Sequence, residues 1–405
     1  MVIHISTSPI TITTILCYQS IYLFCINSSE LIRRFFQLRI QVDQKKLSKH
    51  INIVQKGISS KTTLPILDGI LLEAKDGKLK LTGTDLEIGI ESYLEANILE
   101  EGSIVINSRL FGDIIKKLPN SEIDINVSEN KMNIVCDSSQ FNLIGNSSVE
   151  YPELPTLIDQ LSLKIPMDLF KDIIRQTVFA TTQDETRPIL TGVLFEVIDG
   201  NASFVALDGY RLSLRNIKIN SSEDVKVVIP GRTLSELNKI LEENEEDIEI
   251  TLTPGHIVFN IGDTLVFSRL LEGQFLNYRD IIREDHDTRI KVNRKELQDS
   301  LERASLLAKE EKANLVKLNL FEDKLTIKSN SEIGNVHEEM TVELEGEDVD
   351  IAFNSKYILD GIKAMDEEEI ELFFMGSLNP CIIKPAEEDN YTYLVLPVRL
   401  AKDDY

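Results

Sequence analysis

The sequence contains no tryptophan, and glycine and proline are sparse, with 19 and 12 residues among 405. Collagen-like and low-complexity classes are therefore excluded. Cysteine is also scarce: only Cys17, Cys25, Cys136 and Cys381 are present, and no two have the Cys-x-x-Cys spacing of a zinc or redox site. Because a secreted disulfide framework would need more cysteines in so long a chain, we expect a reducing, cytoplasmic location.

Positive charge is in the minority. Lys and Arg number 43 against 67 Asp and Glu, which gives a net charge of −24. A chain this acidic is a poor candidate for coating nucleic acid over its whole surface, although it leaves room for a local basic face. With 42% hydrophobic and 27% charged residues the composition is that of a globular protein, and the length suits two to four domains.

The sequence also has no stretch with the typical pattern of a membrane span or a targeting segment. Pro9–Ile26 is apolar but is interrupted by polar residues such as Thr13 and Gln19, and no basic residue precedes Arg33. We therefore expect neither a membrane span nor a signal peptide, and no membrane partner. Repeat-like sequence begins near Leu38, so we interpret residues 1–37 as an extension, either a disordered tail or an over-long start.

Catalytic motifs are absent from the sequence. It has no G-x-x-x-x-G-K-[ST], G-x-S-x-G or H-E-x-x-H, and its five histidines are scattered. We predict no catalytic residue, no metal site and no cofactor. Asp85 and Asp208 occupy equivalent repeat positions, but the third copy has Ser331 there, which favours a turn role over a carboxylate pair. A metal-dependent hydrolase using an acidic run, such as 242–247 or 366–369, remains an alternative.

What the sequence does contain is a threefold repeat. Three segments, beginning at Val42, Ile165 and Val292, have apolar residues every three or four positions, which predicts helices. Each is followed by two strand patterns around a polar turn. The turns lie at positions 76, 199 and 322, so they are 123 residues apart both times. The first two are Asp-Gly, a strong hairpin signal.

A second helix is predicted in each repeat, beginning at Asn107-Ser108, at Gly231–Thr233 and at Asn354-Ser355, where Asn, Ser and Thr are available as N-caps. Further alternating strands follow. The pattern predicts an α+β fold of three repeats, each with two helices packed on antiparallel sheets. We assign the domains to residues 38–157, 158–286 and 287–405. The repeat alone leaves an array, an arc and a closed ring open.

The predicted helices differ in charge from the rest of the chain. The six helical windows together carry eight more basic than acidic residues, whereas the whole chain is at −24. This split indicates a shared surface that faces a polyanion, since phosphates attract such a surface without base contacts. The competing interpretation is that Lys is merely a good helix former on solvated faces.

Several long motifs give the chain a resemblance to a known family. They are KTTLPILDGILLE at 61–73, LTGTDLE at 81–87, RPILTGVLF at 187–195, ALDGYRLS at 206–213 and YLVLPVRL at 393–400. In this order and spacing they resemble the bacterial DNA polymerase III beta subunit, the sliding clamp. The resemblance covers about Leu38 to Leu400, all three repeats.

The resemblance implies a head-to-tail homodimer whose six domains close a ring around duplex DNA. Helices would line the hole and sheets would form the outer wall. The implied function is to tether the replicative polymerase for processivity, without an active site. The implied partners are double-stranded DNA, the polymerase catalytic subunit, a clamp-loader ATPase, and repair polymerases, mismatch repair and ligase-type proteins that carry short linear motifs. A monomeric peptide-binding repeat scaffold stays open as a further alternative.

Three sets of site residues are expected. The strongly basic first helix and the resemblance together give the DNA-binding candidates Lys45, Lys46, Lys49, Lys56, Lys61, Arg109, Lys116, Arg232 and Lys239. The resemblance alone places the dimer contact at Phe141 and Leu143 on one chain and Leu306 and Leu307 on the other.

The third set is a hydrophobic cleft for peptide motifs between the second and third domains. Leu207, Tyr210 and Leu276 stand where the family often has Thr, His and Pro, and Pro397 suits an edge strand because it has no N–H to donate. By resemblance the cleft comprises Leu190, Leu207, Gly209, Tyr210, Arg211, Leu212, Leu276, Ile281, Asn354, Tyr357, Leu378, Pro380, Leu394, Val395, Leu396, Pro397, Val398, Arg399 and Leu400.

Overall fold

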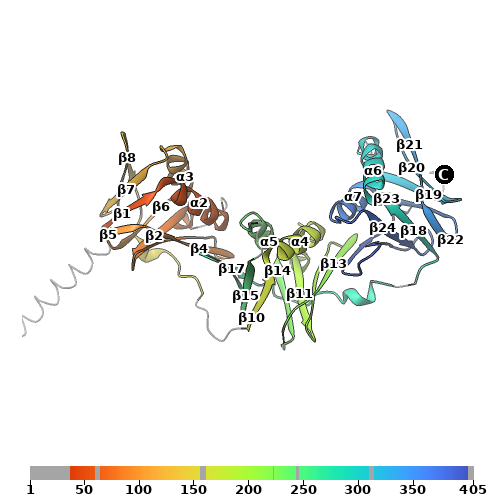
Figure 1. The fold of residues 1–405 in the computed structure, drawn as a ribbon, viewed down its shortest axis with the longest axis horizontal. Coiled ribbons are helices and arrows are strands. Elements are labelled where there is room, and N and C mark those ends of the chain that lie inside the picture. The colour runs from red at the N-terminus through yellow and green to blue at the C-terminus, as the bar shows by residue number, and fades with distance from the viewer. Residues whose placement is uncertain are drawn as a thin grey trace, which may run out of the picture. The chain divides into compact units, whose positions relative to one another are not determined.

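The computed structural model describes residues 37–59, 64–155, 161–221, 223–242, 246–283, 285–309 and 314–399. The chain divides into two compact units (Figure 1). Unit 1 is Met1–Thr156 with Gly262–Phe267, and unit 2 is Leu157–Ile261 with Ser268–Tyr405. None of the described helices is long and apolar enough to cross a membrane.

Unit 1 holds the first repeat. One of its sheets has five strands in the order β5-β1-β7-β8-β9, and β4-β3-β2-β6 are neighbours in a second. The elements are β1 (Gln37–Asp43), α2 (Gln44–Val54), η1 (Gln55–Gly57), η2 (Pro65–Asp68), β2 (Gly69–Lys75), β3 (Lys78–Thr84), β4 (Ile88–Glu95), β5 (Asn97–Glu100), β6 (Gly102–Asn107), α3 (Ser108–Lys117), β7 (Glu122–Ser128), β8 (Lys131–Cys136), β9 (Ser139–Ile144) and η3 (Ser148–Glu150).

Unit 2 begins with the second repeat, in which β10, β15 and β16 are neighbours and β14-β11-β12-β13 form part of a larger sheet. The elements are β10 (Leu161–Pro166), α4 (Met167–Thr177), η4 (Val178–Ala180), η5 (Pro188–Thr191), β11 (Gly192–Ile198), β12 (Asn201–Leu207), β13 (Arg211–Lys218), β14 (Val225–Pro230), α5 (Gly231–Asn238), β15 (Asp247–Thr253) and β16 (His256–Ile261); β17 (Thr264–Arg269) starts in the short segment of unit 1.

The third repeat completes that larger sheet, whose nine strands run β14-β11-β12-β13-β26-β25-β24-β18-β22, and adds a four-stranded sheet, β21-β20-β19-β23. The elements are η6 (Tyr278–Asp280), β18 (Thr288–Asn293), α6 (Arg294–Ala308), β19 (Leu315–Phe321), β20 (Lys324–Ser331), β21 (Gly334–Thr341), β22 (Glu343–Gly346), β23 (Val349–Asn354), α7 (Ser355–Lys363), β24 (Glu369–Phe374), β25 (Cys381–Pro385) and β26 (Tyr391–Val395). The predicted α+β class with two helices per repeat is confirmed.

The helices begin where local chemistry allows them to. The Asp43 carboxylate accepts a hydrogen bond from the Lys46 backbone N–H at 2.9 Å and caps α2. Asn107 and Asn354 cap α3 and α7 as predicted. The prediction of a polar cap for α5 is wrong: Pro230 occupies its N-cap without a side-chain bond.

The hairpin turns confirm the 123-residue repeat. Asp76-Gly77 and Asp199-Gly200 both have positive φ at their two central residues, which is the backbone of a type I′ turn. The third turn uses Glu322 and Asp323, with φ of 48° and 56°. The geometry is therefore retained in the third copy even though no glycine is available to adopt it cheaply.

Buried apolar residues connect the helices to the strands. In α2, Leu47, Ile51 and Val54 are buried at helical spacing against the sheet. Side-chain amides also tie this helix and η1 to α3: Gln44 Nε2 of α2 donates to the carbonyl oxygen of Ile115 at 2.6 Å, and Gln55 Nε2 of η1 donates to that of Ser108 at 2.7 Å. These contacts of α2 with the sheet and with α3 determine which faces of the two helices remain exposed to solvent.

Candidate functional site

The outer face of α2 is basic. Its buried stripe leaves Lys45, Lys46 and Lys49 exposed on the opposite side, and Lys56 half-buried in η1. Lys46 also borders a hollow that it shares with Asp43 and with the Glu95 and Glu122 carboxylates, which weaken its pull on an anion.

The α3 helix, which packs beside α2, continues this face. Arg109 and Lys116 are exposed, and Lys116 lies in the last turn, where the helix dipole favours a cation. Among the described residues, the side chains of Lys45, Arg109 and Lys116 make no ion pair. These three side chains of α2 and α3 therefore present positive charge that no carboxylate in the described part of the chain pairs with.

The helices of unit 2 carry charge that is largely paired. Lys239 contacts Glu236 at 2.8 Å at the end of α5, whereas Arg232 is exposed at its start. In α6, Lys295 pairs with Asp299 at 2.7 Å. The positive charge predicted for the helices is thus unevenly distributed: within the described part of the chain it includes side chains without an ion pair in α2 and α3, and it is largely paired in the helices of unit 2. Lys61 lies outside the described residues.

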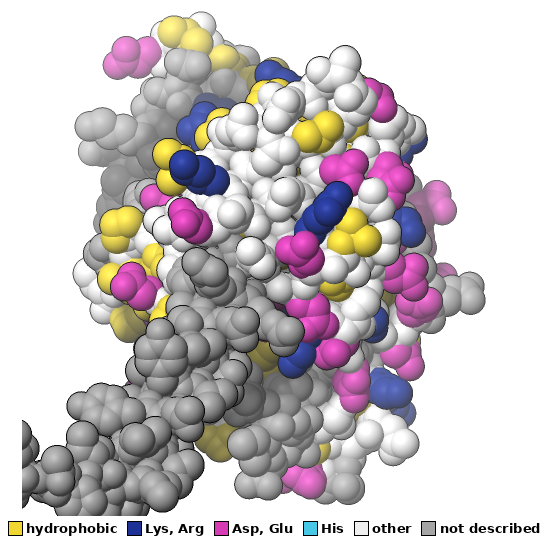
Figure 2. Space-filling view, turned by 90° about the vertical axis from the view of Figure 1, so that its left-hand side faces the viewer, with side chains coloured by type: hydrophobic (Ala, Val, Ile, Leu, Met, Phe, Trp, Pro, Cys, Tyr) yellow, Lys and Arg dark blue, Asp and Glu magenta, His cyan; other side chains and the backbone are white. Residues whose placement is uncertain are grey.

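One end of unit 1 has an apolar surface at the edge strand β9. Phe141 is 38% exposed there, Ile144 is 83% exposed and Leu143 is half-buried. Figure 2 shows this end of the molecule, where hydrophobic side chains reach the surface among charged ones. A hollow of about 240 Å³ adjoins Phe141; its lining is Asp113, Ile114, Lys117, Leu118, Ser139 and Phe141.

The matching prediction for the third repeat falls on α6. Leu306 is 67% exposed on this helix and Leu307 is half-buried. The spacing of Leu297, Leu301 and Ala304 in the sequence would continue to Leu307, but in the structure the buried stripe continues from Ala304 to Ala308. The four-stranded sheet beside α6 ends in β21, which is also an edge strand.

The predicted peptide cleft is built where β13 pairs with β26. Arg211 is the partner of Val395 in this antiparallel ladder, and just beyond it the Leu396 N–H donates to the Tyr210 carbonyl oxygen at 2.9 Å. Two segments almost 200 residues apart in the chain thereby lie side by side in unit 2 (Figure 1).

The cleft residues separate into a buried floor and an exposed rim. The floor is one apolar cluster that includes Leu190, Leu207, Leu212 and Leu394 together with Phe275 and Tyr278. Each such side chain contributes about 1.5–3 kcal/mol by its burial. The rim is formed by apolar side chains that are at least 37% exposed: Tyr210, Leu276, Ile281, Leu378 and Leu396.

The remaining predicted cleft residues take several roles. Asn354 uses its side-chain oxygen to cap α7, and Gly209 has a φ of 95°, which favours glycine. Half-buried positions are Asn354, Tyr357, Pro380, Pro397 and Val398; Arg399 is exposed, Val395 is buried, and Leu400 lies outside the described residues.

The edge-strand prediction for Pro397 is wrong. The strand β26 ends at Val395 and lies between β13 and β25, so it is not an edge. Pro397 instead lies after the end of the strand. The N–H of the next residue, Val398, donates to the Ala352 carbonyl oxygen at 2.8 Å. The proline therefore marks the point where the chain leaves the sheet.

Arg211 is buried beneath the rim. Its guanidinium donates to Asp208 at 3.0 Å, to Asp360 at 2.6 Å and to the carbonyl oxygen of Phe179 at 2.7 Å. It also lies 4.8 Å from the centroid of the Tyr357 ring. These contacts satisfy a buried charge, so Arg211 holds the cleft together and is not a free anion site.

The rim carries an aromatic pair. Tyr210 and Tyr357 stack with centroids 5.7 Å apart and planes at 20°. Since Tyr210 is 57% exposed, the pair offers a flat apolar surface beside the floor.

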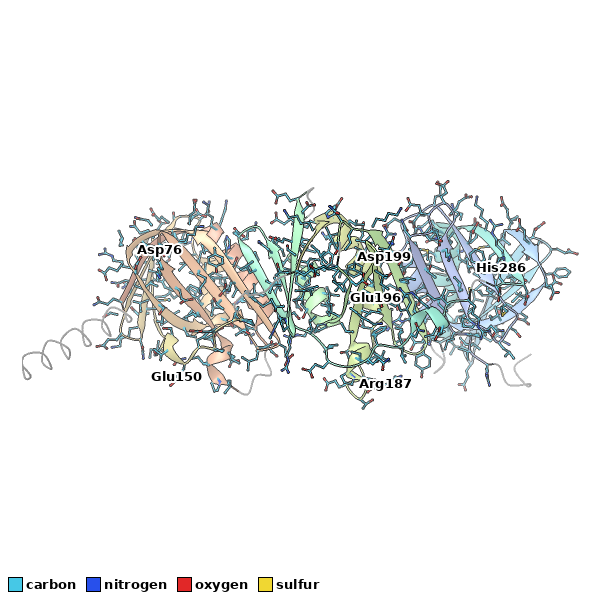
Figure 3. The ribbon with its side chains drawn as sticks, turned by 90° about the horizontal axis from the view of Figure 1, so that it is seen from below. Asp76, Glu150, Arg187, Glu196, Asp199 and His286 are labelled. Atoms are coloured by element: carbon cyan, nitrogen blue, oxygen red, sulfur yellow. The ribbon has the colours of Figure 1, made fainter. Side chains whose placement is uncertain are left out.

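A segment that includes η6 forms another side of the cleft. Tyr278 is buried in the floor cluster, and its hydroxyl donates to the Glu196 carboxylate of β11 at 3.1 Å. Figure 3 marks Glu196 on its strand. Sequence reasoning missed both residues; the available signal was a single acid inside the apolar run of β11.

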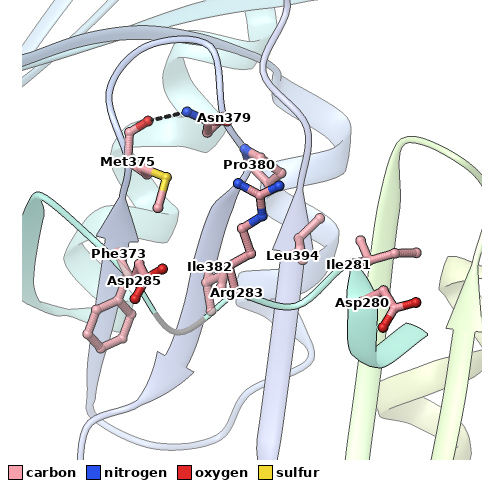
Figure 4. A pocket seen from close by; sticks show the side chains of 10 residues that line it. All are labelled: Asp280, Ile281, Arg283, Asp285, Phe373, Met375, Asn379, Pro380, Ile382 and Leu394. Carbon is pink, nitrogen blue, oxygen red and sulfur yellow. Dashed lines mark hydrogen bonds between the residues drawn. The ribbon is translucent and has the colours of Figure 1, made fainter. Parts of the chain in front are cut away.

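A hollow of about 200 Å³ opens next to this segment (Figure 4). It shares Ile281, Pro380 and Leu394 with the predicted cleft. Sequence reasoning missed the others because they come from two segments about 90 residues apart with no motif in either. They are Asp280, Arg283, Asp285, Phe373, Met375, Asn379 and Ile382.

The acidic residues weighed as catalytic candidates serve turns. Asp85 accepts from the Ile88 N–H at 2.9 Å and Asp208 from the Tyr210 N–H at 2.8 Å, which confirms the predicted turn role. No group of three or more potential metal ligands gathers within the described part of the chain.

A Ser-His-Asp arrangement, with Ser92 and His50 buried and Asp263 exposed, occurs in unit 1. His50 Nδ1 lies 2.8 Å from Ser92 Oγ, and His50 Nε2 lies 3.7 Å from the Asp263 carboxylate. Because Ser92 is 0% exposed and its hydroxyl also contacts Thr264 at 2.8 Å, a substrate has no access to it. The cluster is structural.

Comparisons with known proteins identify the family. Models of the DNA polymerase III beta subunit match in order: the N-terminal domain at residues 38–155, the central domain at 164–277 and the C-terminal domain at 279–399. The chain is 39% identical over 376 residues to the beta sliding clamp of Bacillus subtilis, which covers 89% of this chain and 100% of the relative.

The chain belongs to the beta sliding clamp family. The Staphylococcus aureus beta sliding clamp is 38% identical over 361 residues, which covers 86% of this chain and 96% of that protein. The crystal structure of the Bacillus subtilis sliding clamp superposes with a TM-score of 0.88 at 38% identity, covering 90% of this chain and 100% of the other. A Pseudomonas aeruginosa sliding clamp bound to griselimycin matches with a TM-score of 0.85 at 29% identity, covering 90% and 100%.

The family is the processivity factor of DNA polymerase III and is a non-enzymatic subunit. The matches give no support to the hydrolase or to the monomeric scaffold.

Proposed function

We propose that this chain is a DNA sliding clamp that encircles duplex DNA and tethers the replicative polymerase to it. The observation that carries the proposal is the match of all three family domains, in order, over almost the entire described chain. Lys45, Arg109 and Lys116, which make no ion pair among the described residues, support it, because sliding needs attraction to phosphates without base contacts.

The proposed ring is a head-to-tail homodimer. Each chain contributes three domains, with bounds at residues 38–157, 158–286 and 287–405. The apolar end of unit 1 near Phe141 and the exposed Leu306 of α6 are surfaces of complementary chemistry on two copies. The hollow beside β9 is the proposed seat for Leu306 of the other copy, because Ile114, Leu118 and Phe141 line it, and β9 and β21 are edge strands of their sheets that are open to pairing.

The cleft of unit 2 is the proposed docking site for short linear motifs. Clients include the polymerase catalytic subunit, a clamp-loader ATPase, and repair polymerases, mismatch repair and ligase-type proteins, and the location is the cytoplasm, where replication proceeds. An apolar floor with an aromatic rim suits a few hydrophobic side chains of a peptide. We propose that griselimycin, the ligand of the Pseudomonas aeruginosa relative, binds here too.

Retention on DNA tests the proposal. The purified chain is loaded by a clamp loader onto nicked circular DNA, and the product is compared with linear DNA of equal length by gel filtration. We expect retention on the circle and loss from linear ends, because the link is topological. Equal retention on both forms would contradict encirclement, and sedimentation of the free chain as a monomer would contradict the ring.

A further inference from the structure

Glu196 is a buried acid that is not among the cleft residues implied by the family. It lies in the apolar run Val193–Val197 of β11 and is 4% exposed. A carboxylate in such a position is costly to bury unless charges and hydrogen bonds satisfy it. The groups that bind the Glu196 carboxylate therefore indicate which part of the chain it fixes in place.

Three donors meet at this carboxylate. Tyr278 donates its hydroxyl at 3.1 Å, Arg279 donates from Nη2 at 2.7 Å, and Lys226, its register partner on β14, approaches at 3.0 Å. Burial by itself would raise the pKa of Glu196, but the hydrogen bonds from Arg279 and Lys226 outweigh it and lower that pKa. The acid is thus charged at neutral pH.

Two of the three donors come from η6. The Arg279 guanidinium also lies 4.6 Å from the Tyr278 ring centroid, so ring and cation are fixed to each other as well as to the acid. The ring itself is part of the cleft floor with Leu207 and Leu394. Glu196 consequently ties one turn of the segment between the second and third repeats to the nine-stranded sheet.

On its other side this segment borders an open hollow, although Ile282 packs against the floor cluster. Beyond η6, Ile281 and Arg283 overhang the hollow of about 200 Å³, whose far wall is formed by Phe373 and Met375 (Figure 4). A segment packed on one side and open on the other depends on its anchor for a defined position. The rim residues Leu276 and Ile281 lie two and three residues from Tyr278.

We propose that Glu196 is a positioning residue of the peptide cleft. Through Tyr278 and Arg279 it holds η6 in place, so that Leu276 and Ile281 stand at the rim before a client arrives. A rim that is already ordered spares the client the entropy of ordering it. This inference rests on the proposed function of the cleft.

The test measures griselimycin binding by isothermal titration calorimetry with the full chain. Glu196→Gln keeps the size of the side chain but loses the charge that two cations share. We expect the Kd for griselimycin to rise about tenfold, because the neutral amide holds Arg279 and Tyr278 less strongly than the carboxylate does. The matched control is Glu339→Gln, which breaks the exposed ion pair with Lys324 at 2.8 Å and should leave the Kd unchanged.

A local readout separates positioning from general stability. Because the chain has no tryptophan, Asn277→Trp gives a single reporter beside Tyr278. We expect its fluorescence anisotropy to fall when Glu196→Gln is added, with the circular dichroism spectrum unchanged. An unchanged anisotropy together with an unchanged Kd would overturn the proposal.

Tyr278→Phe keeps the ring in the floor and removes only the hydroxyl donor. It should raise the Kd in the same direction, and the double variant should cost less than the sum of the two, because both break one anchor. If Glu196→Gln does not fold, Tyr278→Phe takes its place in the test. A Tyr278→Phe variant with the Kd and the anisotropy of the wild type would refute the anchor. If the wild-type chain does not bind griselimycin, the proposed cleft fails, while the tryptophan reporter still judges the anchor.

Discussion

His50 is a buried histidine with a direct consequence for stability. Burial lowers its pKa from the usual 6.5, the nearby Asp263 opposes this, and Lys49 and Lys46 reinforce it. The unfolded chain therefore takes up a proton at a higher pH than the folded one. Stability from neutral His50 is complete above about pH 6.5 and is lost as the pH falls below that value.

This predicts a pH-dependent free energy of unfolding in unit 1. Urea denaturation of the wild-type chain should give a lower midpoint at pH 5.5 than at pH 7.5, whereas most carboxylates titrate at lower pH. In His50→Gln, which cannot titrate, the difference between the two midpoints should shrink. A variant whose midpoint still shifts as much as the wild type would assign the pH dependence to other groups.

Single residues also mark the reach of sequence reasoning. The Asp76-Gly77 turn could be predicted from the sequence, because Asp and Gly adopt a positive φ more readily than most residues do. The sequence shows that Pro397 has no N–H to donate, which favours an edge strand. It does not show which strands lie beside β26, and these are decided only in the folded sheet. Glu196 was overlooked because its three donors reach it from β14 and η6 only after folding.

At the scale of elements, the helix pair α2–α3 carries the DNA-binding hypothesis. Lys45 and Arg109 are exposed without an ion pair among the described residues. Each phosphate contact removed should reduce the slope of log K against log salt by about 0.9. We therefore expect Lys45→Ala with Arg109→Ala to weaken duplex DNA binding and to flatten its salt dependence by about 1.8.

Fluorescence anisotropy of labelled duplex DNA across a salt series checks this prediction. The control is Lys295→Ala with Lys324→Ala, two lysines that already pair with Asp299 and Glu339. That variant should keep the wild-type slope. If both variants change it equally, the attraction comes from overall charge and not from the α2–α3 face.

At the scale of the whole molecule, the ring depends on an interface between copies. Leu306→Glu with Leu307→Glu introduces charge on α6 where an apolar contact with β9 of a second copy is proposed. Burying an unpaired carboxylate costs several kcal/mol, more than one side of a modest interface can offset. The expected product is a folded monomer.

Sedimentation velocity and circular dichroism together test this outcome. Ile198→Glu serves as the control, because Ile198 is an exposed apolar residue on the β11 hairpin of the second repeat. It should leave the dimer intact. A dimer that persists in the Leu306/Leu307 variant would show that the two copies meet elsewhere.

The sequence by itself determined the elements, the threefold repeat and the family, because helix periodicity, turn residues and long motifs are properties of neighbouring positions. Tertiary structure alone decided which side chains meet. It buried Arg211 under an aromatic pair, tied Tyr278 to Glu196, and opened a hollow between Arg283 and Met375. Such contacts join residues far apart in the chain, and no local preference encodes them; they arise from packing whole sheets around shared apolar cores.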